Sequence, residues 1–417
     1  MLGALVPFGP GPRYRVMKRL ILSLSLVLLG VACGPTQAQT SVSPSADATT
    51  PSAAPTASSA PGALLFGVLE AASPSTWNTV AIAGLDGRAR AKTTFTPMPV
   101  PNLGCMGAIL APSAHVSAGK VFYADGKGVV RSLAVDGSIT TVATFPMTSS
   151  QQMLSFAVSP DGATVLGTIY TIPTNAHACS GSPSTGTYTF DAYVATSGGA
   201  GKLVYHESWT KPQDVLALTG WDAVGPIGTY PTVWASQGGG PSSTLGVVVR
   251  VDASTIKPMA PLSDPSNCRV WDSTQSGAFV CMGTPVMTGG GTPAQKVSQP
   301  ISVRNAGGTE LWHSTVIGQN SPFGPFLAPD AQHVVICCND LNLADSHELM
   351  VGRDGVQTNL AKGFGASGWL DSKTMVGWVS TDPLDQSPSP MAFVAANAPG
   401  TVVSMGFTGL YVGTIHT

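Results

Sequence analysis

Charged residues are scarce in this chain of 417 residues. Only 10% of them are Asp, Glu, Lys or Arg, and the formal net charge is -2, whereas about a quarter of the residues of an average soluble protein are charged. No basic cluster occurs outside Lys18 and Arg19. The sequence therefore argues against a nucleic-acid partner, because such a partner needs a basic surface.

Helical periodicity and catalytic motifs are absent as well. The seven histidines show no HxH, HExxH or pair at helical spacing, and lone ones such as His206 and His313 are more often surface or packed residues than ligands. No G-x-S-x-G elbow occurs, and the glycine runs 238–240 and 289–291 lack the features of a phosphate loop. We therefore predict no catalytic residue, no cofactor and no metal site, and favour a binding module over an enzyme.

The sequence does contain a repeated hairpin. In its clearest copy, Gly128–Phe145, two β-rich runs flank Asp136-Gly137, a pair that predicts a tight type I′ turn. We count seven copies. The other six span Thr79–Gly87, Asp191–Gly199, Leu245–Ala253, Pro300–Gly308, His347–Gly355 and Met391–Gly400.

Two further strand candidates precede the hairpins. The first strand is expected at Gly107–Pro112, Ser155–Gly162, Gly324–Asp330 and Gly368–Asp371. The second follows at once, at Lys120–Asp125, Ala163–Tyr170, His333–Cys338 and Thr374–Ser380. Four strands per unit indicate a propeller blade, whose sheet packs against neighbours on both faces and so needs no polar face.

Two segments resemble a known repeat. Phe156–Val165 (FAVSPDGATV) and Phe326–Val335 (FLAPDAQHVV) are similar to the Ser-Pro-Asp-Gly repeat of bacterial WD40-like and Tol-type periplasmic propellers. The other blades match in strand order alone. The resemblance implies the propeller fold but no activity, because proteins of this fold range from scaffolds to hydrolases.

The two ends of the repeat region predict how the ring closes. The first hairpin, Thr79–Phe95, is preceded by a single strand at Leu64–Leu69, so its blade lacks an innermost strand. Phe407–Gly413 repeats the innermost pattern with no hairpin after it. We therefore predict an all-β fold, a seven-bladed β-propeller over residues 63–417, in which the carboxyl-terminal strand completes blade one.

The amino end has the features of an export signal. Met17, the expected translation start, opens a short charged region, and apolar residues 20–32 follow it. Residues 29–33, Leu-Gly-Val-Ala-Cys, resemble the bacterial lipoprotein signal, although Gly30 departs from its commonest form. The resemblance implies that residues 1–33 are a lipoprotein signal peptide and that Cys33 is lipidated. An uncleaved anchor and a plain signal peptide are the alternatives.

A low-complexity segment follows the signal. Residues 34–62 are almost wholly Thr, Ser, Ala, Pro and Gln, with Asp47 as their only charge. Such a segment buries too little apolar area to fold, so we expect a disordered tether, which could also carry O-linked sugars. The propeller would then lie outside the cytoplasm and contact the membrane through its lipid anchor only.

Six more cysteines predict disulfides, the usual state in an exported protein. Cys268 and Cys281 fall in the first two strands of blade five, where antiparallel neighbours bring a strand's start beside its partner's end, so they should pair. Cys105 and Cys179 fall on the same rim of blades two and three.

The remaining cysteines, Cys337 and Cys338, are adjacent in sequence. They could form a vicinal disulfide, or one of them could pair with Cys179 or Cys105. Metal binding is a weaker third choice, because no CxxC motif or histidine cluster accompanies them.

Long connections gather on one face of the expected ring, where insertions mark either a binding face or drift in unconstrained loops. They are Thr171–Thr187, Ser236–Ser243, Gly283–Ser298, Asn339–Ser346 and Thr381–Pro390. Four loop acids could hold a rim Ca²⁺ or simply be solvated: Asp340, Asp345, Asp382 and Asp385. Four tryptophans could stack on sugars, but we expect them to pack between blades: Trp221, Trp234, Trp271 and Trp369.

These features together predict a bacterial, lipid-anchored, cell-surface or periplasmic propeller that acts as a scaffold for an envelope protein. The alternative is a cell-wall glycan-binding protein or an enzyme with its site in the central funnel, and a purely structural envelope protein is the third option. Polar and ionisable side chains that converge in the funnel would favour the alternative, and a lining of small apolar residues would favour the scaffold.

Overall fold

The structure, a computed structural model, describes residues 64–73, 76–99, 114–174, 186–196, 198–210, 215–229, 248–262, 268–288, 296–318, 323–337, 347–379 and 390–416. All of them belong to one compact unit, residues 55–417. Their only regular elements are strands, and within these ranges no helix is long and apolar enough to cross a membrane. The signal, the tether and Cys33 lie outside the described residues.

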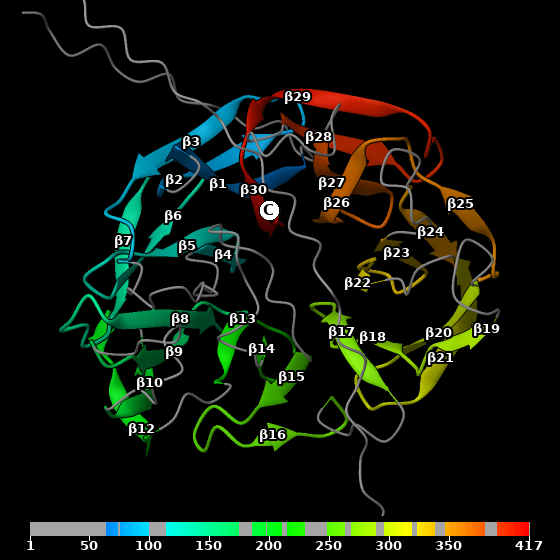
Figure 1. Ribbon diagram of the computed structural model, residues 1–417. Coiled ribbons are helices and arrows are strands. Elements are labelled where there is room, and N and C mark those ends of the chain that lie inside the picture. The colour runs from blue at the N-terminus through cyan, green and yellow to red at the C-terminus, as the bar shows by residue number, and fades with distance from the viewer. Residues whose placement is uncertain are drawn as a thin grey trace, which may run out of the picture. The chain divides into compact units, whose positions relative to one another are not determined.

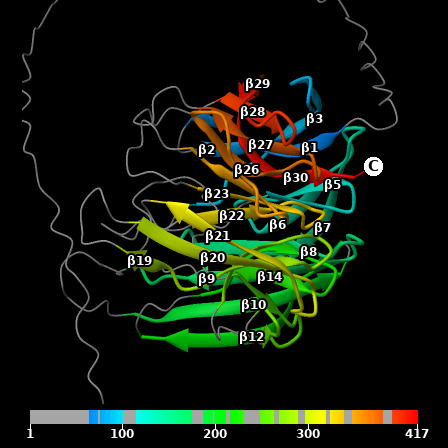
Figure 2. The same cartoon turned by 90° about the vertical axis from the view of Figure 1, so that its right-hand side faces the viewer.

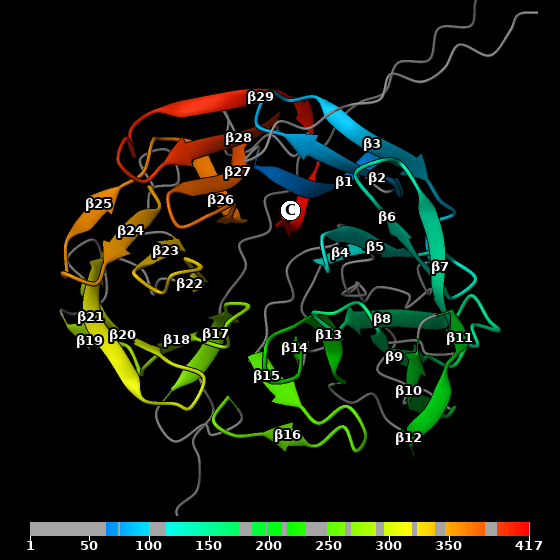
Figure 3. The ribbon, with the colours of Figure 1, turned by 180° about the vertical axis from the view of Figure 1, so that it is seen from behind.

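Within the described residues, thirty strands form seven sheets arranged in a ring (Figures 1 and 3). Blade one holds β1 (Leu65–Ser73), β2 (Thr76–Gly84), β3 (Ala89–Thr94) and β30 (Leu410–Ile415). Blade two holds β4 (Ala114–Ser117), β5 (Lys120–Ala124), β6 (Val129–Leu133), β7 (Ile139–Thr144) and β11 (Gly199–Ala200). Blade three holds β8 (Gln152–Val158), β9 (Thr164–Thr171), β10 (Tyr188–Thr196) and β12 (Lys202–Trp209).

The other four blades follow the same plan. Blade four holds β13 (Ala217–Trp221), β14 (Pro226–Thr229), β15 (Val248–Val251) and β16 (Pro258–Met259). Blade five holds β17 (Arg269–Ser273), β18 (Phe279–Met282), β19 (Val286–Thr288), β20 (Lys296–Arg304) and β21 (Glu310–Gly318). Blade six holds β22 (Phe323–Leu327), β23 (His333–Cys337), β24 (Leu349–Gly352) and β25 (Gln357–Asn359). Blade seven holds β26 (Phe364–Trp369), β27 (Thr374–Val379), β28 (Pro390–Ala395) and β29 (Val402–Thr408).

The carboxyl-terminal strand closes the ring as predicted. β30 pairs antiparallel with β1, so that Leu65 lies opposite Ile415 and Leu69 opposite Leu410. β30 is thereby the innermost strand of blade one, and Figure 2 shows it running through the ring toward the end of the chain. The protein is a seven-bladed β-propeller, and both ends of the described chain share one sheet.

The core consists of seven apolar clusters, one between each pair of neighbouring blades. Strand β18 shows how one strand serves two of them. Phe279 and Cys281 pack toward blade four, whereas Val280 and Met282 pack toward blade six. Because side chains alternate along a strand, a strand with neighbouring blades on both faces can bury apolar residues at successive positions, which helps to explain the low charge content.

The turn at Asp136-Gly137 differs from the predicted type I′ turn. Gly137 alone has a positive φ, 84°, and the Ala134 carbonyl accepts the Gly137 N–H while the Ser138 carbonyl accepts the Ala134 N–H. This pattern is a type I turn followed by a glycine bulge. The Asp136 carboxylate accepts the Ser138 N–H. Glycine occupies the one left-handed position, which it adopts without steric cost.

Two first strands also differ from the prediction. The range Gly107–Pro112 lies outside the described residues, and the innermost strand of blade two is β4, which a two-residue turn at Ala118-Gly119 joins to β5. Both turn residues have positive φ, 45° and 71°. In blade seven β26 ends at Trp369, so Gly368–Asp371 contains the strand's end and the following turn rather than the whole strand.

Candidate functional site

The innermost strands surround a central channel, which includes two adjoining cavities. The first, of about 350 Å³, is lined by residues of blades one, two, four, five and six. The second, of about 410 Å³, shares His115, Asp272 and Phe326 with the first and extends to blade seven and to Tyr411 of β30. The side chains that meet here come from positions up to about three hundred residues apart in the chain, so only the closed ring brings them together.

Bulges shape much of the channel wall. The innermost strands of blades four, five, six, seven and one each skip a register position where they pair with the next strand, whereas β4 and β8 pair without a break. A bulge leaves a residue unpaired and turns the side chains beside it in a new direction. Residues at these skipped positions that line the channel are Thr219, Trp271, Pro325, Ser367 and Val412.

Asp272 follows one of these bulges. In the β17–β18 pair Val270 lies opposite Cys281 and Asp272 opposite Val280, so Trp271 has no partner. The Asp272 carboxylate accepts the N–H groups of Ser273 and of Leu327 in blade six, both at 2.8 Å. Burial raises the pKa of this carboxyl to about 7, and the two N–H groups lower it only in part. The side chain keeps partial exposure to the channel.

Asp222, at the end of β13, is the second acid on the first cavity. Its Oδ1 accepts the N–H groups of Val224 and Gly225, at 2.8 and 2.9 Å. The Arg250 guanidinium, from β15, donates to both carboxylate oxygens through Nε, each at 3.1 Å, and also through Nη2. Asp222 is 1% exposed and Arg250 is fully buried, so this pair is an interior salt bridge.

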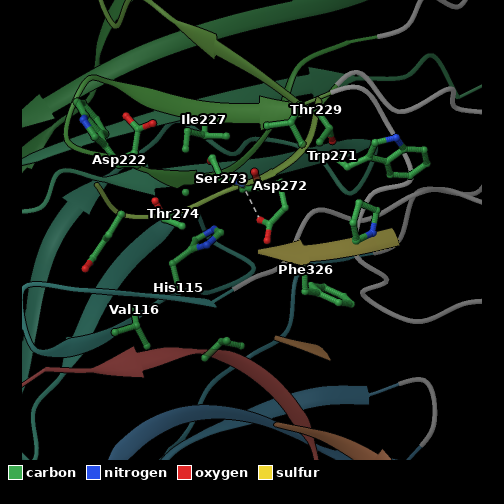
Figure 4. A pocket seen from close by; sticks show the side chains of 17 residues that line it. His115, Val116, Asp222, Ile227, Thr229, Trp271, Asp272, Ser273, Thr274 and Phe326 are labelled. Atoms are coloured by element: carbon green, nitrogen blue, oxygen red, sulfur yellow. Dashed lines mark hydrogen bonds between the residues drawn. The ribbon is translucent and has the colours of Figure 1, made fainter. Parts of the chain in front are cut away.

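His115, on β4, lines both cavities. Its ring meets that of Phe156 edge-on, with centroids 4.8 Å apart. Burial lowers the pKa of His115 to about 4, so the imidazole is neutral at physiological pH. Its buried Nε2 has no hydrogen-bond partner among the described residues. Figure 4 shows the imidazole and the Asp272 carboxyl reaching into the space between Thr274 and Phe326.

The channel is polar but carries no cation of its own. Its described lining residues include hydroxyl, amide, imidazole and carboxyl groups together with aromatic rings, but no Lys or Arg. No three His, Cys, Asp or Glu side chains of the described part of the chain gather as a metal site would require. Such a wall can hydrogen-bond a small polar molecule and stack against it, but its described residues provide no Lys or Arg to neutralise an anion.

Comparisons with known proteins find only distant structural similarity. No protein-family model matches the chain, and a search of curated proteins also finds no match. Among solved structures, an oligogalacturonate lyase in complex with manganese is 10% identical, with a TM-score of 0.44 over 76% of this chain and 82% of that one. An oligogalacturonate lyase from Vibrio parahaemolyticus is 11% identical, with a TM-score of 0.39 over 84% and 90%.

A TolB-type protein from Agrobacterium tumefaciens is 13% identical, with a TM-score of 0.30 over 84% of this chain and 91% of that one. These similarities are too weak to carry an argument about activity or ligand. The propeller assignment rests on the strand order and pairing of the chain itself.

The predicted site residues meet different outcomes. Cys268 and Cys281 form the disulfide expected from the strand map, with Cα atoms 5.2 Å apart. Cys337 is also in a disulfide, whose partner lies outside the described residues. The following residues likewise lie outside them: Cys105, Cys179, Cys338, Trp234, Asp340, Asp345, Asp382 and Asp385.

Of the four tryptophans that could stack on sugars, the three within the described residues pack between blades, as expected, and stacking on a sugar stays untested. Trp221, Trp271 and Trp369 pack at clusters between blades and also line the channel. His206 and His313 lie exposed on outer strands, hydrogen-bonded to Asp191 and Glu310.

Sequence reasoning missed His115, Asp222, Arg250 and Asp272. One of the four left a signal in the sequence, because Arg250 interrupts an apolar third strand, and an arginine there needs a buried acid.

Proposed function

We propose that the protein is a lipid-anchored, extracytoplasmic binding module whose ligand, a small polar molecule such as a cell-wall glycan fragment, occupies the central channel. The observation that carries this proposal is the convergence of His115, Asp272, Thr274 and Gln275 in one cavity of about 350 Å³. Pockets of this size with a few converging polar groups and aromatic walls are typical of small-molecule sites. The polar lining favours a channel ligand over a pure scaffold.

The test is calorimetric titration of the full chain, purified in detergent, with neutral mono- and disaccharides. Thr219→Phe should fill the channel and weaken binding at least tenfold. Thr309→Phe, on an exposed turn outside the channel, is the matched control and should bind as the wild type does. Binding that survives Thr219→Phe would contradict the proposal, and release of a modified sugar would show that the channel site is an enzyme's.

The lipid anchor is a separate part of this proposal and rests on the signal-like residues 17–33. Cys33→Ala should move the protein from the membrane fraction to the soluble fraction and abolish incorporation of a labelled fatty acid. Unchanged labelling would contradict the assignment of Cys33.

A scaffold role is the second candidate, favoured by an exposed apolar pair on blade five. Val286 and Ile317 are 56% and 61% exposed, and both lie opposite Ser298 of β20, so they share one face of the sheet. An envelope protein that is retained by the wild type and lost with the double substitution Val286→Ser and Ile317→Ser would support this role. Equal retention would contradict it.

A further inference from the structure

The two acids on the first cavity differ in how many of their oxygen lone pairs are used. Asp222 accepts from two backbone N–H groups and from the Arg250 guanidinium. Asp272 accepts one N–H on each oxygen, and among the described residues no Lys or Arg forms an ion pair with it. Since a carboxylate has about four lone-pair sites, Asp272 can accept further donors from the channel.

Among the described residues, no Lys or Arg lines the channel beside Asp272. Arg269, on the same strand, places its guanidinium over the Trp271 ring, 4.5 Å from the centroid. The other titratable groups that line the two cavities are Asp222, which Arg250 neutralises, His115 on β4, which is neutral at pH 7, Tyr411 on β30, and His416, which follows β30. The Tyr411 hydroxyl donates to the Trp369 carbonyl at 2.7 Å, so it is not available to Asp272.

We propose that Asp272 is the anchor for an ammonium group, so that the channel's ligand is a small amine-bearing molecule rather than a neutral or acidic one. This inference rests on the proposed function, because it takes the central channel as the ligand site. The two backbone N–H groups hold the carboxyl in place, and its remaining lone pairs accept the N–H donors of the ammonium. The Phe326 ring lines the same cavity and offers a cation–π contact.

The electrostatics of Asp272 point the same way. Burial raises the pKa of Asp272 to about 7, so near neutral pH the carboxyl carries a proton in part of the molecules. An ammonium ion beside it favours the ionised form and expels that proton. Amine binding near pH 7 is therefore expected to release a fraction of a proton, whereas binding of an uncharged analogue is not.

The test uses three matched probes: 2-aminoethyl, 2-hydroxyethyl and carboxymethyl glucoside. They share one sugar ring and differ only in the terminal group, which is a cation, a neutral hydroxyl or an anion. Calorimetry on the full chain at pH 7, in buffers of different ionisation enthalpy, gives both affinity and proton release. We expect the amine to bind at least tenfold more tightly than the hydroxyl probe, the acid to bind most weakly, and only the amine to release protons.

Two variants assign the preference to Asp272. Asp272→Asn keeps the shape and one acceptor but removes the charge, so the preference for the amine should fall to about one. Glu348→Gln is the matched control, because Glu348 is a buried acid that accepts the Ala366 N–H between blades six and seven and lines neither cavity of the channel. It should keep the full preference.

The outcomes separate the two levels of the proposal. Equal binding of the amine and hydroxyl probes, or an amine preference that persists in Asp272→Asn, overturns the ammonium site and leaves the channel as the binding site. Absence of proton release on amine binding also overturns it, and this measurement needs no variant. If no probe binds, or if Thr219→Phe leaves binding unchanged, the channel itself is not the site.

Discussion

Asp222 and Asp272 line the same cavity from neighbouring blades, yet the chain treats them in opposite ways. Asp222 lies at the tight turn after β13 and is neutralised by Arg250, a residue of the third strand of its own blade. Asp272 lies within the first strand of blade five, after a bulge, and bonds only to backbone N–H groups.

The difference shows how to distinguish an acid that forms an internal salt bridge from an acid that can bind a cation from outside. Asp222 and Arg250 join the turn after β13 to β15, and next to them the Ala223 N–H donates to the Gln275 carbonyl of blade five. Removing either partner of such a buried pair leaves an uncompensated charge. Asp272 has no charged partner to lose, so its cost to folding depends on pH, and a cation from outside could compensate it.

The largest expected effect comes from breaking the compensated pair. Arg250→Met should lower the free energy of unfolding by about 3–5 kcal/mol, because it leaves the Asp222 carboxylate buried without its cation. Denaturant unfolding followed by fluorescence measures the loss. The double variant Asp222→Leu with Arg250→Met should recover most of it. A loss below about 1 kcal/mol in the single variant would show that the pair is not the buried salt bridge described here.

The second effect separates Asp272 from Asp222 through pH. The pKa of Asp272 rises from 3.8 to about 7 on folding, so between these values the folded chain binds more protons than the unfolded chain. This group's contribution to stability therefore falls as the pH rises from about 4 to 7 and is level above. Asp272→Asn removes that fall.

Melting temperatures at pH 5 and pH 8 measure the effect. The melting temperature of the Asn variant minus that of the wild type should be larger at pH 8 than at pH 5. At each pH the melting temperature of the wild type must be subtracted from that of the variant. Burial also raises the pKa of Glu348, to about 8, so that in both proteins the stability contributed by Glu348 falls as the pH rises. Melting curves that shift in parallel would contradict the assignment.

The fold was largely predictable, because its rules are local or topological. Apolar strands and repeated hairpins indicated the blades, and the strand missing from blade one, together with the extra strand at the carboxyl end, indicated ring closure by β30. The Cys268–Cys281 bond followed from the antiparallel order of β17 and β18. The turn type at Asp136-Gly137 was wrong because a dipeptide does not reveal whether one more residue joins the loop as a bulge.

The channel was not predictable in the same way. A bulge such as that at Trp271 depends on the register with the next strand, and the sequence shows only that both strands are apolar. Asp272 acquires its partner Leu327, 55 residues away, only when blades five and six pack together, and its cavity neighbour His115, from blade two, only when the ring forms. The raised pKa of Asp272 is thus a property of the assembled channel rather than of the segment that contains it.

The smallest expected effect tests whether the channel disfavours charge in general. Burial lowers the pKa of His115 from 6.5 to about 4, so between these values the unfolded chain binds more protons than the folded one. Its contribution to stability rises with pH in this window, opposite in sign to that of Asp272 and over a shorter range.

His115→Phe keeps an aromatic ring beside Phe156 and removes the titration. The melting temperature of the variant minus that of the wild type should be larger at pH 4.5 than at pH 7.5. The reason is that only the wild-type chain must bury a group that water would protonate at the lower pH. If the difference between the two proteins is the same at both pH values, His115 is solvated in the folded ring, and the channel is wetter and less selective toward charge than the contrast between Asp222 and Asp272 implies.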